Sequence, residues 1–213
     1  MIGHSRSSKI PRRKDVVSQG KTIGQIPIVS IICHSFNHEH YIKGTLEAMT
    51  SQLTDFPLEI IIHDDASTDQ SQRIIREVCD KQHDHTVVTI LQEQNQFSQG
   101  RRPPRFTFPR ARGEFIALCE GDDYWTSPNK LQRQVDAMRR HSDIDLCVHP
   151  AMRLSMRTGK LKKGFDHGPT ESIVPPKTVI ERHNQFAPTA SVLMRREAAQ
   201  AMPEWFFKAP DLP

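Results

Sequence analysis

Two adjacent carboxylates, Asp122 and Asp123, follow Glu120 in a short polar stretch. The apolar run 114–119 before them has the composition of a buried strand, and a Ser-Pro pair after them is typical of a helix start. These acids are therefore expected on a loop at the carboxyl end of a strand, the edge where open α/β sheets bind ligands. They could hold a hard divalent cation that contacts phosphate oxygens, or they could form an ordinary polar turn.

Two further polar loops are predicted at the same edge of the sheet. Residues 34–38 follow the apolar run 28–33, and the acidic residues 64–69 follow the run 58–63. Pooled carboxylates repel one another unless a cation or a donor-rich ligand neutralises them, so the convergence of these loops favours a ligand site. The basic stretch 101–112 offers counter-charges for phosphates.

The elements that must position these loops alternate along the chain. Apolar residues at positions 42, 46, 49 and 53 mark one face of a helix over 39–53. Further helices are expected after a Ser67 or Thr68 cap, and from Pro128 after a Ser127 cap. Strands are expected at 28–33, 58–63, 87–91, 114–119 and 144–148. This order indicates βαβ units and a largely parallel sheet with both faces covered. Residues 92–112 and 157–178 are expected to be loops, the first of them functional or mobile.

Composition limits the remaining choices. The 213 residues carry a net charge of +4, and no apolar run reaches the length of a membrane span. Six Lys and Arg residues against one Asp give residues 1–26 a charge of +5, which predicts a disordered, solvated tail rather than one bound to acidic lipid or nucleic acid. No apolar leader segment follows the N-terminus. Four cysteines without CxxC spacing indicate buried, reduced thiols in a reducing compartment.

Three blocks of the sequence together suggest a family. Residues 29–39, 59–69 and 111–125, in this order and spacing, resemble the family 2 glycosyltransferases of GT-A fold. The resemblance is good over 27–150 and weaker to the end. It implies an α/β domain of GT-A type, 27–213, with a Rossmann-like, mostly parallel sheet flanked by helices. Residues 27–150 would form the nucleotide-sugar half and residues 151–213 a partial acceptor region.

The resemblance also implies an enzyme that moves a sugar from a nucleotide-sugar donor, usually a UDP-sugar, to an acceptor hydroxyl with inversion. Mn²⁺ or Mg²⁺ would be the cofactor, held by Asp123, and Glu120 is not implied as a ligand. Asp65 would contact the nucleobase, and Asp122 would face the ribose or donor sugar. The other donor-binding positions would be His34, Phe36 and Asn37 of the first loop, and Arg112, which could face the diphosphate or be a surface residue.

The chain ends where the family's general base is expected, after residues 189–191. Asp211 is the only acid near that end and is the candidate base. The short C-terminus makes donor binding a firmer expectation than catalysis. The acceptor is expected to be a glycan, a lipid-linked sugar or a protein, in polysaccharide or other glycan biosynthesis. A cytoplasmic location, with a peripheral contact at the inner face of a membrane left open, fits this function.

Three rival functions remain. The chain could bind nucleotide sugars without turnover, or bind nucleic acid through its tail, although no nucleic-acid partner is expected. A nucleotidyltransferase would need a Gly-rich phosphate loop after the first strand, and residues 34–38 do not supply one. His63 and His149 are expected to be structural, and Trp125 either stacks on an acceptor or packs its own loop.

Overall fold

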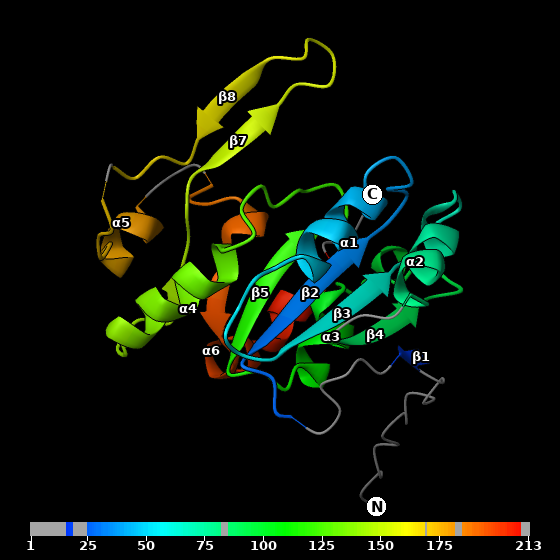
Figure 1. Cartoon of the computed structure of the whole chain (residues 1–213), viewed down its shortest axis with the longest axis horizontal. Coiled ribbons are helices and arrows are strands. Elements are labelled where there is room, and N and C mark those ends of the chain that lie inside the picture. Colours follow the sequence, from blue (N-terminus) through cyan, green and yellow to red (C-terminus); the bar gives the residue numbers. More distant parts are fainter. Residues whose placement is uncertain (1–15, 19–24, 82–84, 169, 182–184, 210–213) are drawn as a thin grey trace, which may run out of the picture.

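A seven-stranded sheet forms the centre of the computed structural model, which describes residues 16–18, 25–81, 85–168, 170–181 and 185–209 (Figure 1). The four middle strands are parallel, and β1 and β9 run antiparallel to their neighbours. In spatial order the strands are β1 (Val16–Ser18), β4 (Thr86–Leu91), β3 (Leu58–Asp64), β2 (Val29–Ser35), β5 (Phe115–Glu120), β9 (Leu193–Arg195) and β6 (Leu146–Cys147). The predicted α/β class with a mostly parallel sheet is confirmed.

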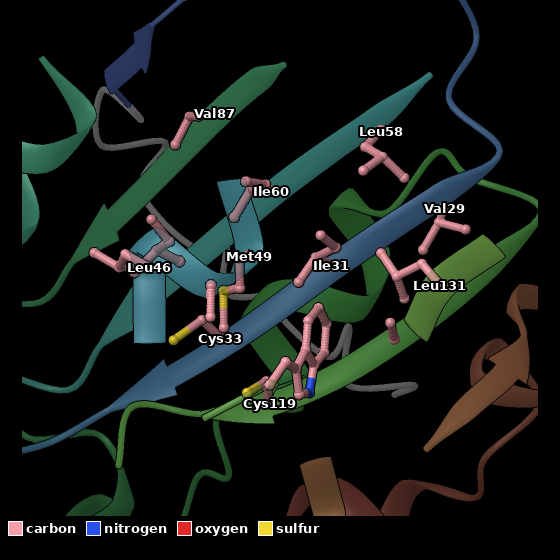
Figure 2. Close-up of a cluster of buried hydrophobic side chains, with 14 of the residues drawn as sticks. Val29, Ile31, Cys33, Leu46, Met49, Leu58, Ile60, Val87, Cys119 and Leu131 are labelled. Atoms are coloured by element: carbon pink, nitrogen blue, oxygen red, sulfur yellow. The ribbon is translucent and has the colours of Figure 1, made fainter. Parts of the chain in front are cut away.

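Helices cover both faces of the sheet, as the continuous apolar strands require. On one face, Ile31 and Cys33 of β2 belong to a core cluster with the apolar sides of the helices α1 (Ile42–Thr50), α2 (Ser71–Cys79) and α4 (Lys130–Arg140) (Figure 2). On the other face, Ile32 packs with Phe108 and Ala199. These two residues come from the short helix η2 (Phe108–Arg110) and from α6 (Arg196–Gln200). Alternate side chains of each strand therefore supply two separate cores.

The helices begin later than the sequence predicted. Neither Ser67 nor Thr68 caps α2; the Asp69 carboxylate accepts the N–H of Ser71 at 2.9 Å instead. Helix α4 begins at Lys130, three residues after the expected Ser127 cap, and no side chain caps it. The apolar spacing located the buried helical faces, because packing rather than the cap decides where they lie. The exception is Leu53, which was expected on the face of the first helix but lies beyond the end of α1 and is 62% exposed.

Residues 92–112 are not an open loop. They contain η1 (Phe97–Gln99), α3 (Pro104–Thr107) and η2, and Phe108 and Thr107 are fully buried. The expectation of a long loop was wrong because three short helical turns leave no common apolar period in the sequence.

The C-terminal third also holds more structure than predicted. Within the expected loop 157–178, β8 (Leu161–Gly164) pairs antiparallel with β7 (Ala151–Leu154), and α5 (Pro176–Ile180) follows. The short helices η3 (Thr189–Ser191) and η4 (Glu204–Phe207) flank β9 and α6. Because β9 lies between β5 and β6, residues on both sides of position 150 share one sheet.

The predicted disorder of residues 1–26 is wrong for Val16–Ser18, which pair with β4 as an edge strand. Residues 1–15 and 19–24 lie outside the described part of the chain. Cys33, Cys79 and Cys119 are buried free thiols, as predicted, whereas Cys147 is a free thiol that is only half-buried. Within the described residues, none of the helices has both the length and the apolar character needed to cross a membrane.

A buried charged network closes the amino edge of the sheet. Glu59, 1% exposed, accepts the Ser30 hydroxyl at 2.6 Å and both the main-chain N–H and the guanidinium of Arg112, at 2.7 and 2.8 Å. Gly113 donates to the Ser30 hydroxyl, and a Cβ at Gly113 would come within 2.6 Å of the Ser30 nitrogen. Every oxygen of the Glu59 carboxylate is therefore partnered within the fold.

Candidate active site

A cleft of about 550 Å³ opens at the carboxyl edge of the sheet. Its walls come from the loop after β2, the loop after β3, the segment before α3, and the end of β5. The lining residues on which the site depends are His34, Phe36, Asp65, Asn95, Phe97 and Glu120. The predicted convergence of three post-strand loops is thus what the fold produces, with the segment 95–103 as a fourth wall.

Strand register brings three ionisable side chains into one row. His34 of β2 is paired with His63 of β3 on one side and with Glu120 of β5 on the other. Paired residues on neighbouring parallel strands point to the same face of the sheet, so all three lie on the face covered by α3 and η2. The sequence placed His34 and Glu120 in different loops, whereas the register makes them neighbours.

The acidic loop forms a compact group of oxygen ligands. Carboxylate oxygens of Glu120, Asp122 and Asp123 lie within 4.8 Å of one another. Oxygen donors at this spacing suit Mg²⁺ or Mn²⁺, which prefer carboxylates and water to nitrogen or sulfur ligands. The sequence assigned the metal to Asp123 alone and gave Glu120 no metal role; in the fold Glu120 belongs to the same acidic group.

A threonine from α1 holds the shape of this loop. The Thr45 hydroxyl, almost fully buried, lies 3.0 Å from the Gly121 carbonyl and 2.7 Å from the Asp123 carbonyl. The Gly121 N–H donates to the His34 carbonyl at 2.8 Å. A Cβ at Gly121 would approach His38 Nδ1 to 2.6 Å, so only glycine fits here without displacing the ring. His38 also lies beside the group, with Nε2 4.0 Å from Asp122 Oδ2.

The acidic group carries uncompensated charge. Burial and the carboxylates of Asp123 and Asp122 raise the pKa of Glu120, an effect only partly offset by a hydrogen bond with Thr189. Burial and Asp122 likewise raise the pKa of Asp123. A divalent cation would remove this repulsion, so the residues fit the metal that the family resemblance implies.

Asp65 lies at the opposite wall of the cleft and is only 3% exposed. Its Oδ1 accepts the N–H of Gln96 at 2.7 Å, and its Oδ2 accepts the N–H of Phe97 at 3.0 Å. A carboxylate has about four acceptor positions, so two remain for a ligand. The segment 95–97 is thereby fixed against the loop after β3, and Asn95 donates to the Asp65 carbonyl as well.

The two histidines of the row are held neutral. Burial, and then the neighbouring His63, lower the pKa of His34 to about 3. Burial lowers the pKa of His63 to about 4, with Asp64 acting in the opposite direction. His34 Nε2 lies 3.0 Å from the Thr107 hydroxyl, and the His63 ring stacks on Phe106 with centroids 5.2 Å apart. His63 is fully buried, in keeping with its expected structural role.

Three predicted residues have other partners. Arg112 does not face the cleft: it lies at the amino edge, paired with Glu59, because it precedes β5 whereas the cleft follows it. Asn37 Oδ1 accepts the Thr68 N–H at 2.8 Å and so links two loops rather than lining the cleft. Trp125 is buried and donates to the Ala190 carbonyl at 2.8 Å, which makes it the packing residue of its loop. Asp211 lies outside the described residues.

Sequence reasoning missed several residues that shape the site. Thr45, Thr107 and the lining residues Asn95, Phe97 and Ser98 act through contacts between segments far apart in sequence. The polar composition of 92–112 was the one available signal, and it indicated function without indicating which residues.

The sheet and its cleft define a GT-A fold, shared with residues 1–349 of S. aureus TarS in complex with UDP. That match has a TM-score of 0.59 at 23% identity and covers 81% of this chain and 48% of the TarS 1–349 chain. The family model described as glycosyl transferase family 2 matches residues 30–202. The chain belongs to glycosyl transferase family 2.

Two relatives illustrate the range of this similarity. An uncharacterized protein of Mycobacterium tuberculosis is 34% identical over 194 residues, covering 84% of this chain and 52% of its own length. The Escherichia coli protein WfaP, named a UDP-Glc:alpha-D-GlcNAc-diphosphoundecaprenol beta-1,3-glucosyltransferase, is 34% identical over 112 residues, covering 52% of this chain and 41% of WfaP. The chain spans about half the length of the curated relatives it matches, 52% in the first of these.

Proposed function

We propose that this chain carries the donor-binding part of a metal-dependent, inverting glycosyltransferase. It would transfer a sugar from a nucleoside diphosphate sugar, in the first instance a UDP-sugar, to an acceptor hydroxyl in glycan biosynthesis. The observation that carries the proposal is the group of carboxylates, Glu120, Asp122 and Asp123, of which Glu120 lines the same cleft as Asp65. TarS, which has the same fold, is known in complex with UDP, and WfaP takes its name from a UDP-sugar donor.

The two walls suit the two ends of such a donor. Asp65 offers fixed acceptor positions for a base N–H, and the exposed ring of Phe36 beside it offers a stacking surface. His34, neutral because of its low pKa, adds no charge to this end of the cleft. The diphosphate would then lie toward the acidic group, which can accept it only together with a cation.

Glu120, Asp122 and Asp123 would hold the Mn²⁺ or Mg²⁺ ion. When bound, the cation supplies Lewis-acid stabilisation for the negative charge that develops on the departing nucleoside diphosphate. Thr45 and Gly121 keep the carboxylates in place through the loop backbone. Asp122, an exposed acid, is proposed to face the donor sugar or ribose. The general base that activates the acceptor is proposed to be Asp211, and residues 151–213 to belong to the acceptor side.

Calorimetric titration with UDP tests donor binding. We expect binding to wild type with Mn²⁺, loss of binding with EDTA, and loss in Asp123→Ala. Asp80→Ala, an exposed acid at the end of α2, serves as the matched control and should bind normally. If UDP does not bind, GDP, dTDP and CDP follow, and failure of all four would refute the proposal.

Turnover needs a separate assay, because a chain that binds the donor could still lack catalysis. Hydrolysis of UDP-glucose or UDP-GlcNAc over hours, dependent on Mn²⁺ and abolished in Asp123→Ala, would establish bond cleavage. Metal-dependent UDP binding without any cleavage would instead favour the rival function, a nucleotide-sugar-binding protein without turnover.

A further inference from the structure

The β7–β8 hairpin stands apart from the rest of the fold. Figure 1 shows it extending away from the sheet, on the side toward which the β5 arrow points. Neither strand makes more than marginal contact with any other helix or strand that the structure describes. A two-stranded hairpin with so little packing is only marginally stable in water, so a surface that contacts it would contribute to its order.

The tip of the hairpin, residues 153–162, combines exposed apolar and cationic side chains. Leu154 and Leu161 face each other across the strands and are 51% and 63% exposed, and Met156 in the turn is 68% exposed. The adjacent cross-strand pair is Arg153 and Lys162. Soluble surfaces rarely gather large apolar side chains at one projecting point without a binding partner.

The charge of this segment is of one sign. Residues 151–164 contain five Lys and Arg residues and no Asp or Glu. Lys163 pairs with Asp166 at 2.6 Å, whereas Arg153, Arg157, Lys160 and Lys162 have no carboxylate partner among the described residues. Exposed apolar side chains surrounded by cations that lack carboxylate partners complement the interface of an anionic lipid bilayer, where negative headgroups cover an apolar interior.

We propose that the hairpin tip is a contact site for anionic membranes. Leu154, Met156 and Leu161 enter the headgroup region, while the long side chains of the four cations reach the lipid phosphates. The strands do not enter the hydrocarbon, because both outer edges of a two-stranded ribbon leave main-chain N–H and C=O groups unpaired. The contact is therefore peripheral and reversible.

Sedimentation with vesicles tests this contact on the full chain. Vesicles of phosphatidylcholine alone are compared with vesicles that also contain phosphatidylglycerol, which supplies the negative surface potential of an anionic leaflet. We expect binding only to the anionic vesicles, weakened by added salt. Arg153→Gln with Lys162→Gln should lower the partition coefficient roughly 30-fold, since each cation contributes about one factor of five. Leu154→Ser with Leu161→Ser should lower it at least about tenfold.

Matched controls test whether the loss of binding is specific to the hairpin or follows from removing any exposed charge or apolar side chain. Arg76→Gln with Lys81→Gln removes two exposed charges from the region of α2, and Ile180→Ser removes an exposed apolar residue from α5. Both should bind vesicles like wild type. Arg12→Gln with Arg13→Gln tests the basic N-terminal segment. Loss of binding in this variant with retention in both hairpin variants would overturn the proposal.

Two other outcomes also count against the hairpin as a membrane site. If wild type binds neither vesicle, the proposal is wrong. If Leu154→Ser with Leu161→Ser converts a dimer into a monomer in analytical ultracentrifugation and leaves vesicle binding unchanged, the tip is an interface between copies of this chain. UDP binding, measured on the same variants, should stay at the wild-type level, so failure here and failure of the proposed donor site are distinguishable.

Discussion

The two edges of the central sheet both carry carboxylates, yet they differ in how those charges are compensated. At the amino edge, Glu59 has the Arg112 guanidinium, a main-chain N–H and the Ser30 hydroxyl as partners. At the carboxyl edge, Glu120, Asp122 and Asp123 have mainly one another, and the pKa values of Glu120 and Asp123 are raised. A carboxylate satisfied within the fold stabilises structure, whereas a group left uncompensated is available to a ligand.

The largest effect is expected at the carboxyl edge. Asp123→Asn keeps the shape of the side chain and removes one charge from the acidic group. We expect sugar transfer or donor hydrolysis to fall by about 100-fold or more, measured as kcat/KM with Mn²⁺. The melting temperature without metal should stay the same or rise, because repulsion is relieved. A marked fall in melting temperature would show that Asp123 is structural, and the contrast between the edges would be lost.

Glu59→Gln is the matched change at the amino edge. The amide cannot accept from all three donors, so buried or half-buried N–H and O–H groups lose their partners. We expect the free energy of unfolding to fall by about 2 kcal/mol, measured by urea denaturation. UDP affinity of the folded variant should equal that of wild type. Impaired UDP binding at full stability would contradict the structural role.

The histidine row predicts how stability depends on pH. His63 has a folded pKa of about 4, below its ordinary value, so the unfolded chain binds a proton that the folded chain does not. The contribution of neutral His63 to the free energy of unfolding is therefore fully present above about pH 6.5 and is lost as the pH falls toward 4. At pH 5 the loss is about 2 kcal/mol for this residue.

Urea denaturation at several pH values measures this dependence. His63→Gln, which cannot titrate, should be less stable than wild type at pH 7 but should show a shallower fall in stability between pH 6.5 and 5. Identical pH slopes in the two proteins would mean that His63 is protonated in the folded state.

The smallest effect is expected from the loop support. Thr45→Val keeps the side-chain shape and removes the hydroxyl that contacts the Gly121 and Asp123 carbonyls. We expect a loss of about 1 kcal/mol in stability and a roughly tenfold weaker Mn²⁺ affinity from a looser acidic loop. Thr50→Val, which removes a hydroxyl from the end of the same helix, serves as the control and should leave Mn²⁺ affinity unchanged. Equal Mn²⁺ affinity in the two variants would show that the Thr45 hydroxyl does not support metal binding by the acidic loop.

The sequence by itself determined where the main parallel strands lie along the chain and which loops follow them. β-branched runs such as 28–33 and 58–63 form buried parallel strands, and whatever follows a parallel strand lies at one edge of the sheet. For that reason Asp65, Asp122 and Asp123 were placed at the carboxyl edge correctly, and the family blocks had the expected fold.

Only the tertiary structure decided which side chains meet. Strand register places Glu120 beside His34. Packing between distant segments pairs Arg112 with Glu59 and brings the Thr45 hydroxyl into contact with the acidic loop. The β7–β8 hairpin and the short turns of 92–112 were likewise absent from the sequence pattern. The contacts of Glu120, Arg112 and Thr45 join residues tens of positions apart, whereas periodicity and composition report only on neighbours along the chain. The hairpin and the turns are local, but each is too short to leave an apolar period in the sequence.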